Sequence, residues 1–257
     1  MSFAAGDEPH PIAVDAFSCA KAGNRREEYE DAWAVRGSDS PRAARLAVAD
    51  GATEASFSAL WAALLAESWV RSRASGADFP RRLAAARRLW ARKVRGRRLP
   101  WYAEEKARRG AYAAFLGVAL VPRTGAFRAV AVGDCNLFLL RGLGPALRLA
   151  RSFPLERSEE FGSSPFLLGS VARPDDDPSP HVRVTEGIVP GDGLLLLASD
   201  ALSAWLLRRE EEGRPAWEAV SPLGIEDGLD FEALVGEARE DGCRNDDMTL
   251  VRVVPRP

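Results

Sequence analysis

Cysteine and histidine are scarce in this sequence of 257 residues. Its three cysteines, Cys19, Cys135 and Cys243, are odd in number, widely spaced and without a Cys-x-x-Cys pair. This pattern argues against a disulfide framework and indicates free thiols in a reducing compartment. The two histidines, His10 and His181, belong to no cluster of metal-ligand spacing, so we interpret both as incidental to metal binding.

Long hydrophobic runs and a strong charge imbalance are missing as well. The longest strongly apolar stretch, around Leu194 to Ala198, is far shorter than the ~20 residues that a membrane helix needs. The N-terminal residues lack a basic segment followed by an apolar one, so no signal peptide is expected. The net charge of −2 argues against general attraction to nucleic acid or anionic membranes. We therefore expect a cytoplasmic protein with no nucleic-acid and no membrane partner.

The chain has the composition of an ordinary globular protein, with 46% hydrophobic and 28% charged residues. Apolar and β-branched segments predict strands at residues 12–17, 32–35, 46–49, 115–121, 127–132, 137–141, 181–184, 194–199 and 249–254. Helical periodicity predicts helices at 57–69, at 79–94 with Asp78 as its cap, near Trp101, at 202–213, and at 230–242 with Asp230 as its cap. Short turns join the three strands of residues 115–141, which predicts an antiparallel meander. Little regular patterning is seen at 144–169.

The segment from Arg71 to Arg109 is the compositional outlier, with fourteen Lys or Arg and three acidic residues. A helix at 79–94 would carry the arginines on the face opposite its apolar stripe. One interpretation is a solvated basic helix face. The other is a docking surface for an acidic or phosphorylated partner.

Four acidic residues stand at the predicted ends of strands. Asp50 and Asp200 each follow a buried strand, whereas Asp31 and Asp246 each precede one. Strand starts and strand ends share one edge of an antiparallel sheet, so the four carboxylates are expected to converge. Gly51 lets the chain turn sharply after Asp50 and leaves its carbonyl oxygen accessible.

Such a cluster is strongly repulsive unless a cation neutralises it. Oxygen ligands without a nearby His or Cys favour a hard ion, Mg²⁺ or Mn²⁺, and two such ions are expected. Two ions roughly 3.5–4 Å apart activate water and clamp a phosphoryl oxygen. The implied chemistry is in-line attack of water on a phosphate ester.

Five short motifs follow one another along the chain: RREEYEDA (Arg25 to Ala32), VADGAT (Val48 to Thr53), VGDCN (Val132 to Asn136), LLASDA (Leu196 to Ala201) and NDDMTLV (Asn245 to Val251). Their order and rough spacing are those of the motifs of the PP2C-like, metal-dependent protein phosphatases (the PPM family), so the chain resembles a divergent bacterial member of that family. The resemblance implies an α+β fold, a β-sandwich of two mostly antiparallel sheets flanked by pairs of helices. It extends over nearly the whole chain and implies one domain, residues 1–257, with a core at about 12–254.

The resemblance also implies roles for the metal-binding residues. Asp50 would bridge both ions and Gly51 would give its carbonyl to one, while Asp200 and Asp246 would bind the other. A third ion lacks an evident ligand, because only Glu104 and Glu105 lie near the expected position.

Three further residues acquire roles from the same resemblance. Glu30 and Asp31 would hold metal-bound waters, and one of them can ligate directly. Arg26 matches a phosphate-binding arginine found in part of the family. Arg26 and Asp50 are thus the expected catalytic residues.

The implied activity is that of a Mg²⁺- or Mn²⁺-dependent protein serine/threonine phosphatase. Its substrate would be a phosphorylated protein, with a serine/threonine kinase as its opponent. Two departures from the family pattern support an alternative, a catalytically weak or inactive module that binds a partner. Ala201 replaces a usual glycine, and Ala52 replaces the histidine proposed as general acid in animal members.

Overall fold

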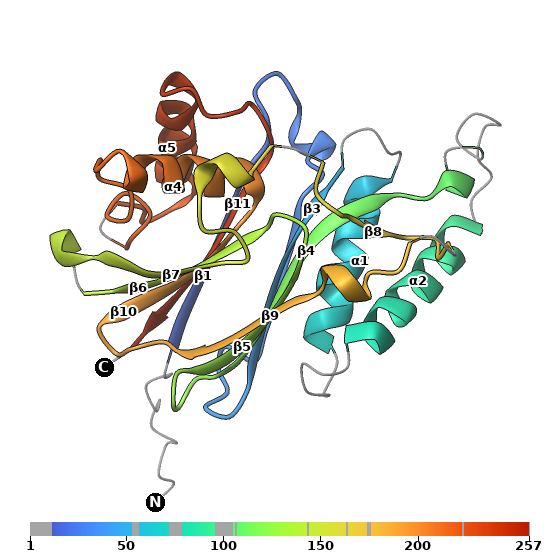
Figure 1. The fold of residues 1–257 in the computed structure, drawn as a ribbon, viewed down its shortest axis with the longest axis horizontal. Coiled ribbons are helices and arrows are strands. Elements are labelled where there is room, and N and C mark those ends of the chain that lie inside the picture. Colours follow the sequence, from blue (N-terminus) through green and yellow to red (C-terminus); the bar gives the residue numbers. More distant parts are fainter. Residues whose placement is uncertain are drawn as a thin grey trace, which may run out of the picture.

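The computed structural model describes residues 12–52, 57–71, 79–95, 105, 107–142, 144–162, 164–173, 176–222 and 224–256. Its strands form two sheets in which every pairing is antiparallel, and helices cover the outer face of each sheet (Figure 1). The expected α+β sandwich flanked by pairs of helices is confirmed. The predictions made for His10, Thr53, Asp78, Trp101 and Glu104 fall outside the described residues.

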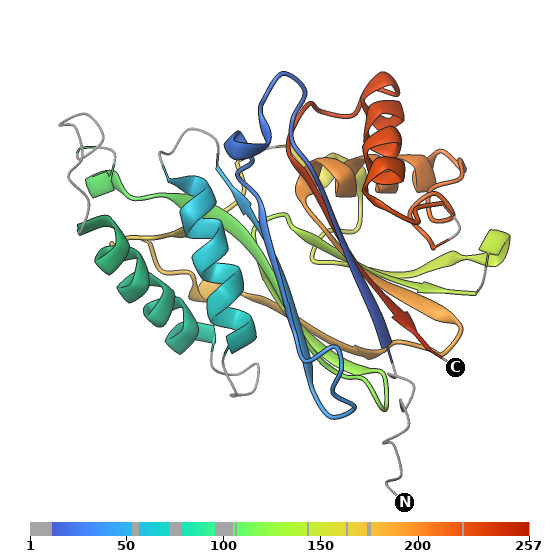
Figure 2. The ribbon, with the colours of Figure 1, turned by 180° about the vertical axis from the view of Figure 1, so that it is seen from behind.

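The first sheet contains both ends of the described chain. Its strands, in spatial order, are β1 (Ile12–Cys19), β11 (Met248–Pro255), β10 (Gly193–Ala198), β6 (Asn136–Arg141) and β7 (Arg148–Phe153). The helices α4 (Asp200–Glu211) and α5 (Gly228–Glu240) lie on its outer face, as Figure 2 shows from behind.

The second sheet packs against the first. Its strands, in spatial order, are β2 (Ala32–Arg36), β3 (Ala44–Gly51), β4 (Tyr112–Val121), β5 (Ala126–Val132) and β9 (Arg183–Ile188), and the short β8 (Leu168–Gly169) pairs with β4. The helices α1 (Ser58–Arg71) and α2 (Phe79–Arg95) cover its outer face (Figures 1 and 2). Short 3-10 helices are η1 (Arg26–Glu28), η3 (Gly144–Ala146), η4 (Ser158–Glu160) and η5 (Ser179–His181).

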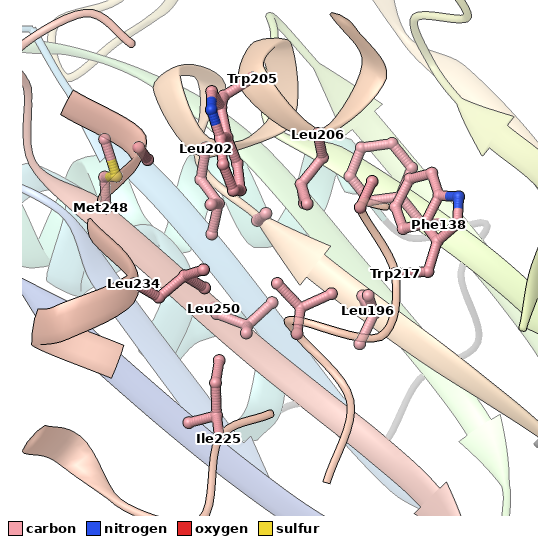
Figure 3. Packing of buried hydrophobic residues seen from close by; sticks show 14 of the residues in the cluster. Phe138, Leu196, Leu202, Trp205, Leu206, Trp217, Ile225, Leu234, Met248 and Leu250 are labelled. Carbon is pink, nitrogen blue, oxygen red and sulfur yellow. The ribbon is translucent and has the colours of Figure 1, made fainter. Parts of the chain in front are cut away.

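Three apolar clusters fill the spaces between these four layers. β10 shows why its sequence is an unbroken run of leucines: Leu194 and Leu196 face α4 and α5, whereas Leu195 and Leu197 face the second sheet. A strand covered on both faces needs apolar residues at every position. Burying one such leucine side chain contributes about 1.5–3 kcal/mol to the free energy of unfolding. Figure 3 shows Leu196 in the cluster between the first sheet and its two helices, near residues of α4.

The structure corrects three sequence predictions. The meander is wrong at its third strand, because β4 and β5 pair in the second sheet while β6 lies between β10 and β7 in the first. The chain changes sheets at Gly133, which has a positive φ of 89°. β7 lies within the region that showed little patterning. The cap of α5 is Asp227, whose carboxylate accepts the backbone N–H groups of Leu229 and Asp230.

The basic helix α2 carries seven Lys or Arg and no acidic residue. One of them, Arg82, is buried: its Nη1 donates to the Trp69 carbonyl at 3.0 Å, and its guanidinium stacks on that indole ring.

Within the described ranges, no helix combines the length and apolar character needed to cross a membrane.

Candidate active site

Acidic side chains from four separate segments line one cavity of about 390 Å³. Asp50 comes from the end of β3, Asp134 from the turn between β5 and β6, Asp200 from the start of α4, and Asp246 from just before β11. In Figure 1, β3 ends and β11 begins at the upper end of the sandwich, so Asp50 and Asp246 come from that end.

Antiparallel pairing explains why these segments meet. Ala32 at the start of β2 lies opposite Ala49, next to the end of β3. Ala198 at the end of β10 lies opposite Leu250, near the start of β11. Each pair of strands therefore brings one acidic residue that follows a strand and one that precedes a strand to the same edge. The structure places Asp50, Asp200 and Asp246 in one cavity, as their positions in the sequence predicted.

Gly51 lies where a side chain does not fit. A Cβ atom on this residue would be 2.6 Å from the carbonyl oxygen of Glu30 and 3.0 Å from the carbonyl carbon of Ser58. Both are backbone atoms, one just before β2 and one at the start of α1, so neither can move without shifting the chain around it. The backbone beside Asp50 therefore packs closely against the residues at the start of β2 and of α1.

Glu30 and Asp31 are not among the residues that line the cavity, so Asp31 is the one of the four acids expected to converge that does not line it. Asp31 is buried, and the Thr249 hydroxyl donates to its carboxylate at 2.8 Å. The Glu30 carboxylate accepts a hydrogen bond from Ser58 Oγ at the start of α1. In this structure both acids connect neighbouring elements, and their predicted role toward metal-bound water stays a prediction.

Asp247 is a buried acid that the sequence analysis gave no role. Its two carboxylate oxygens accept the backbone N–H groups of Lys21 at 2.8 Å and Glu30 at 2.6 Å. It thereby ties the β1–β2 connection to the start of β11. Two adjacent acids before a strand thus do different things: Asp246 faces the cavity and Asp247 anchors the backbone beside it.

Asp134 also lines the cavity, although its motif, VGDCN, predicted no separate role for it. The signal was present, because Asp134 follows a buried strand just as Asp50 and Asp200 do. In the sequence, Asp134 stands in a short turn between two predicted strands. Glu105, considered for a third ion, is instead exposed and pairs with Arg109 at 2.6 Å.

Burial and mutual repulsion shift the titration of these acids. Burial, opposed by the Thr249 hydrogen bond and reinforced by Asp247 and Asp200, raises the pKa of Asp31 to about 8. Burial, reinforced by Asp200, raises the pKa of Asp134 to about 7. The pKa of Asp50 is raised well above its usual range, by burial first and then by Asp31 and Asp200. Without a bound cation, the cluster therefore holds protons near neutral pH.

The arginine in this cavity is Arg244, which the sequence analysis did not single out. Its Nη2 pairs with the Asp200 carboxylate, and its Nε lies 3.2 Å from Asp246 Oδ2. Arg26, the predicted phosphate-binding residue, is exposed in η1 and does not line the cavity. In the sequence, the only indication of a role for Arg244 is its position two residues before Asp246.

The donor set fits a hard divalent cation, since four carboxylates and the backbone of Gly51 line one cavity. The close backbone packing that excludes a Cβ at Gly51 also suits a residue that would bind through its carbonyl oxygen. Among the described residues, however, no three His, Cys, Asp or Glu side chains already stand in an arrangement able to hold an ion. Two of the candidate ligands pair with Arg244 instead.

The two residues that depart from the family pattern flank these ligands. Ala52 lines the cavity, and its N–H donates to the Tyr112 carbonyl at 3.0 Å. Ala201 is buried in the first turn of α4. Neither methyl group can donate a proton.

No protein-family model and no curated protein matches the sequence. Solved structures do match in fold. A serine/threonine phosphatase of Mycobacterium tuberculosis, PstP/Ppp, aligns with a TM-score of 0.59 and 16% identity over 96% of this chain and 99% of that chain. The catalytic domain of PstP in complex with two manganese ions gives 0.57 and 17% over 95% and 97%. A chain solved in work on the bacterial stressosome gives 0.52 and 18% over 94% and 98%.

These likenesses establish that the chain has the fold of PP2C-type serine/threonine phosphatases. Identities of 16–18% establish the fold alone.

Proposed function

We propose that this protein is a Mg²⁺- or Mn²⁺-dependent protein phosphatase that hydrolyses phosphoserine or phosphothreonine. The observation that carries the proposal is the convergence of Asp50, Asp134, Asp200 and Asp246 on one cavity in a phosphatase fold. A protein of the same fold, PstP, has been solved with two manganese ions.

In this proposal Asp50, Gly51, Asp200 and Asp246 would hold the two ions. The chemistry that such an ion pair supplies when bound is activation of water and polarisation of a phosphoryl oxygen. The acids alone repel a phosphate dianion, so the chain needs the cations before it can accept its substrate.

The residues around the ligands keep the cavity in shape. The hydrogen bond from Thr249 orients Asp31, and Asp247 fixes the backbone at Glu30. Arg26 stays the proposed phosphate-binding residue, reaching the substrate from the exposed η1. Because Ala52 carries no ionisable group, protonation of the leaving alkoxide falls to solvent in the cavity.

The test is release of phosphate from an aryl phosphate and from a phosphothreonine peptide, with Mn²⁺ present. We expect activity that a chelator abolishes. Asp50→Asn should lower the rate by more than about 100-fold, since even substitutions outside the first ligand shell cost 10–100-fold. The matched control Asp192→Asn, in the exposed β9–β10 turn, should leave the rate unchanged. Activity that persists in chelator would refute the proposal.

The proposed substrate in the cell is a phosphorylated cytoplasmic protein, and a serine/threonine kinase acting on the same protein is the proposed opponent. A substrate peptide should therefore be dephosphorylated only at phosphoserine or phosphothreonine.

A second candidate is a non-catalytic module that binds a partner. It is favoured by a groove of about 760 Å³ between α1 and α2, lined by leucines such as Leu60 and Leu89 and by basic residues such as Arg81 and Lys93. Glu67 also lines this groove and pairs with Arg71 at 2.5 Å. An apolar groove with a basic rim suits an acidic amphipathic segment. The match to a chain from work on the stressosome, a modular signalling system, is consistent with this role. Absence of Mn²⁺ binding together with binding of an acidic partner would favour it.

A further inference from the structure

We propose that Arg244 is a built-in counter-ion of the acidic cavity, and that its guanidinium competes with divalent cations for Asp200 and Asp246. The inference rests on the proposed metal site, but not on phosphatase activity.

Arg244 occupies the position where a cation is needed. Its guanidinium pairs with Asp200 through Nη2 and with Asp246 through Nε at 3.2 Å. These are two of the three carboxylates proposed to bind the ions. Arg244 therefore connects the same α4 and β11 ligands that a bound ion would connect.

The charge balance of the cavity gives Arg244 its importance. Among the described lining residues, four are acidic and Arg244 is the only basic one. A guanidinium stays protonated at all ordinary pH values, so it cannot leave this position by losing its charge. Only movement of the side chain releases the carboxylates.

The structure offers Arg244 a place to move to. The residue also lines a second cavity of about 280 Å³, which shares Asp200 and Gly162 with the acidic cavity. The second cavity is lined in addition by Glu159, an exposed acid of η4 that pairs with Arg157 at 3.0 Å, and by the basic Arg208. Arg244 is half-exposed, and its backbone lies outside any helix or strand. In this proposal, rotation about the side-chain bonds of Arg244 carries its guanidinium from one cavity toward the other.

Competition between Arg244 and divalent ions for Asp200 and Asp246 lowers the affinity of the protein for metal. If Arg244 covers two ligands in most metal-free molecules, the apparent dissociation constant for metal equals the intrinsic one divided by the fraction of molecules in which the ligands are uncovered. Removing the guanidinium should therefore tighten metal binding. A residue that merely positions Asp200 and Asp246 would have the opposite effect, because its loss would disorder the ligands.

The experiment is calorimetric titration of Mn²⁺ into the full chain and three variants. We expect Arg244→Gln to bind Mn²⁺ about tenfold more tightly than the wild type, a factor that corresponds to about 1.4 kcal/mol. Arg244→Lys keeps the charge but not the two-pronged geometry, so its affinity should lie between the two. Arg128→Gln is the matched control, because Arg128 forms an exposed ion pair with Glu186 at 2.7 Å across β5 and β9. It should bind like the wild type.

A melting experiment supplies the second readout. Loss of Arg244 should lower the melting temperature of the metal-free protein more than that of the Mn²⁺-loaded protein. Unchanged or weaker Mn²⁺ binding by Arg244→Gln overturns the inference, as does absence of binding in every variant. Tighter binding without phosphate release by the wild type would support the inference and count against the proposed function.

Discussion

Gly51 shows how one residue without a side chain constrains the site. A methyl group there would meet the Glu30 carbonyl oxygen and the Ser58 carbonyl carbon at 2.6 and 3.0 Å. We predict that Gly51→Ala destabilises the protein by about 1–3 kcal/mol, the usual cost of overpacking, and weakens Mn²⁺ binding. Chemical denaturation and calorimetry measure the two effects.

The control is the same substitution where space is free. A Cβ at Gly236, inside α5, would have nothing within 4 Å, so Gly236→Ala should stabilise the protein by about 0.4–1 kcal/mol. Equal effects of the two substitutions would contradict the steric explanation.

At the scale of residues, the sequence identified the acids that flank strands and missed those that only the third dimension reveals. Asp50, Asp200 and Asp246 were recognisable because an acid directly after or before an apolar run is a local pattern. Arg244 was not recognisable, since its partner Asp200 is 44 positions away in the chain. Asp134 had the local pattern, but its short turn suggested a hairpin instead.

At the scale of elements, hydrophobic pattern predicted most strands and helices and failed where exposure dilutes the pattern. β7 was missed because its sequence, RLARSF, has arginines at exposed positions of an edge strand. The cap of α5 was placed three residues late because Asp227 and Asp230 form a reciprocal pair: each carboxylate accepts an N–H group from the other residue's backbone. Both acids suit a helix start, and only the geometry distinguishes them.

The crossing from β5 to β6 shows a different limit. A short connection between two strands is typical of a hairpin, and the turn GDC is short enough for one. Here the strands belong to different sheets, and the turn carries Asp134 into the cavity. Which sheet a strand joins depends on packing against distant strands, and the local sequence does not encode it.

At the scale of the whole molecule, the acidic cavity makes stability depend on pH and metal together. The raised pKa of Asp31, about 8 against an ordinary 3.8, means that the folded metal-free protein holds a proton that the unfolded chain releases above about pH 4. Asp134, with a pKa of about 7, behaves likewise. The unfolded state thus binds fewer protons, so the contribution of these groups to stability falls as pH rises toward 8.

We therefore predict that the melting temperature of the protein in chelator decreases from pH 5.5 to pH 8.5. Mn²⁺ should raise the melting temperature more at pH 8 than at pH 6, because protons no longer compete for the carboxylates. Asp31→Asn should flatten the pH dependence in chelator. A melting temperature that rises with pH in chelator would contradict this explanation.

The proposed function requires Asp50, Asp200 and Asp246 to share bound divalent ions. Anomalous diffraction from crystals soaked in Mn²⁺ tests this, because it locates each ion and its oxygen ligands. We expect two manganese peaks in the cavity, both within coordination distance of the Asp50 carboxylate, with the Arg244 guanidinium withdrawn from Asp200 and Asp246. Crystals with no manganese in the cavity, and with Arg244 still paired to both carboxylates, would contradict it.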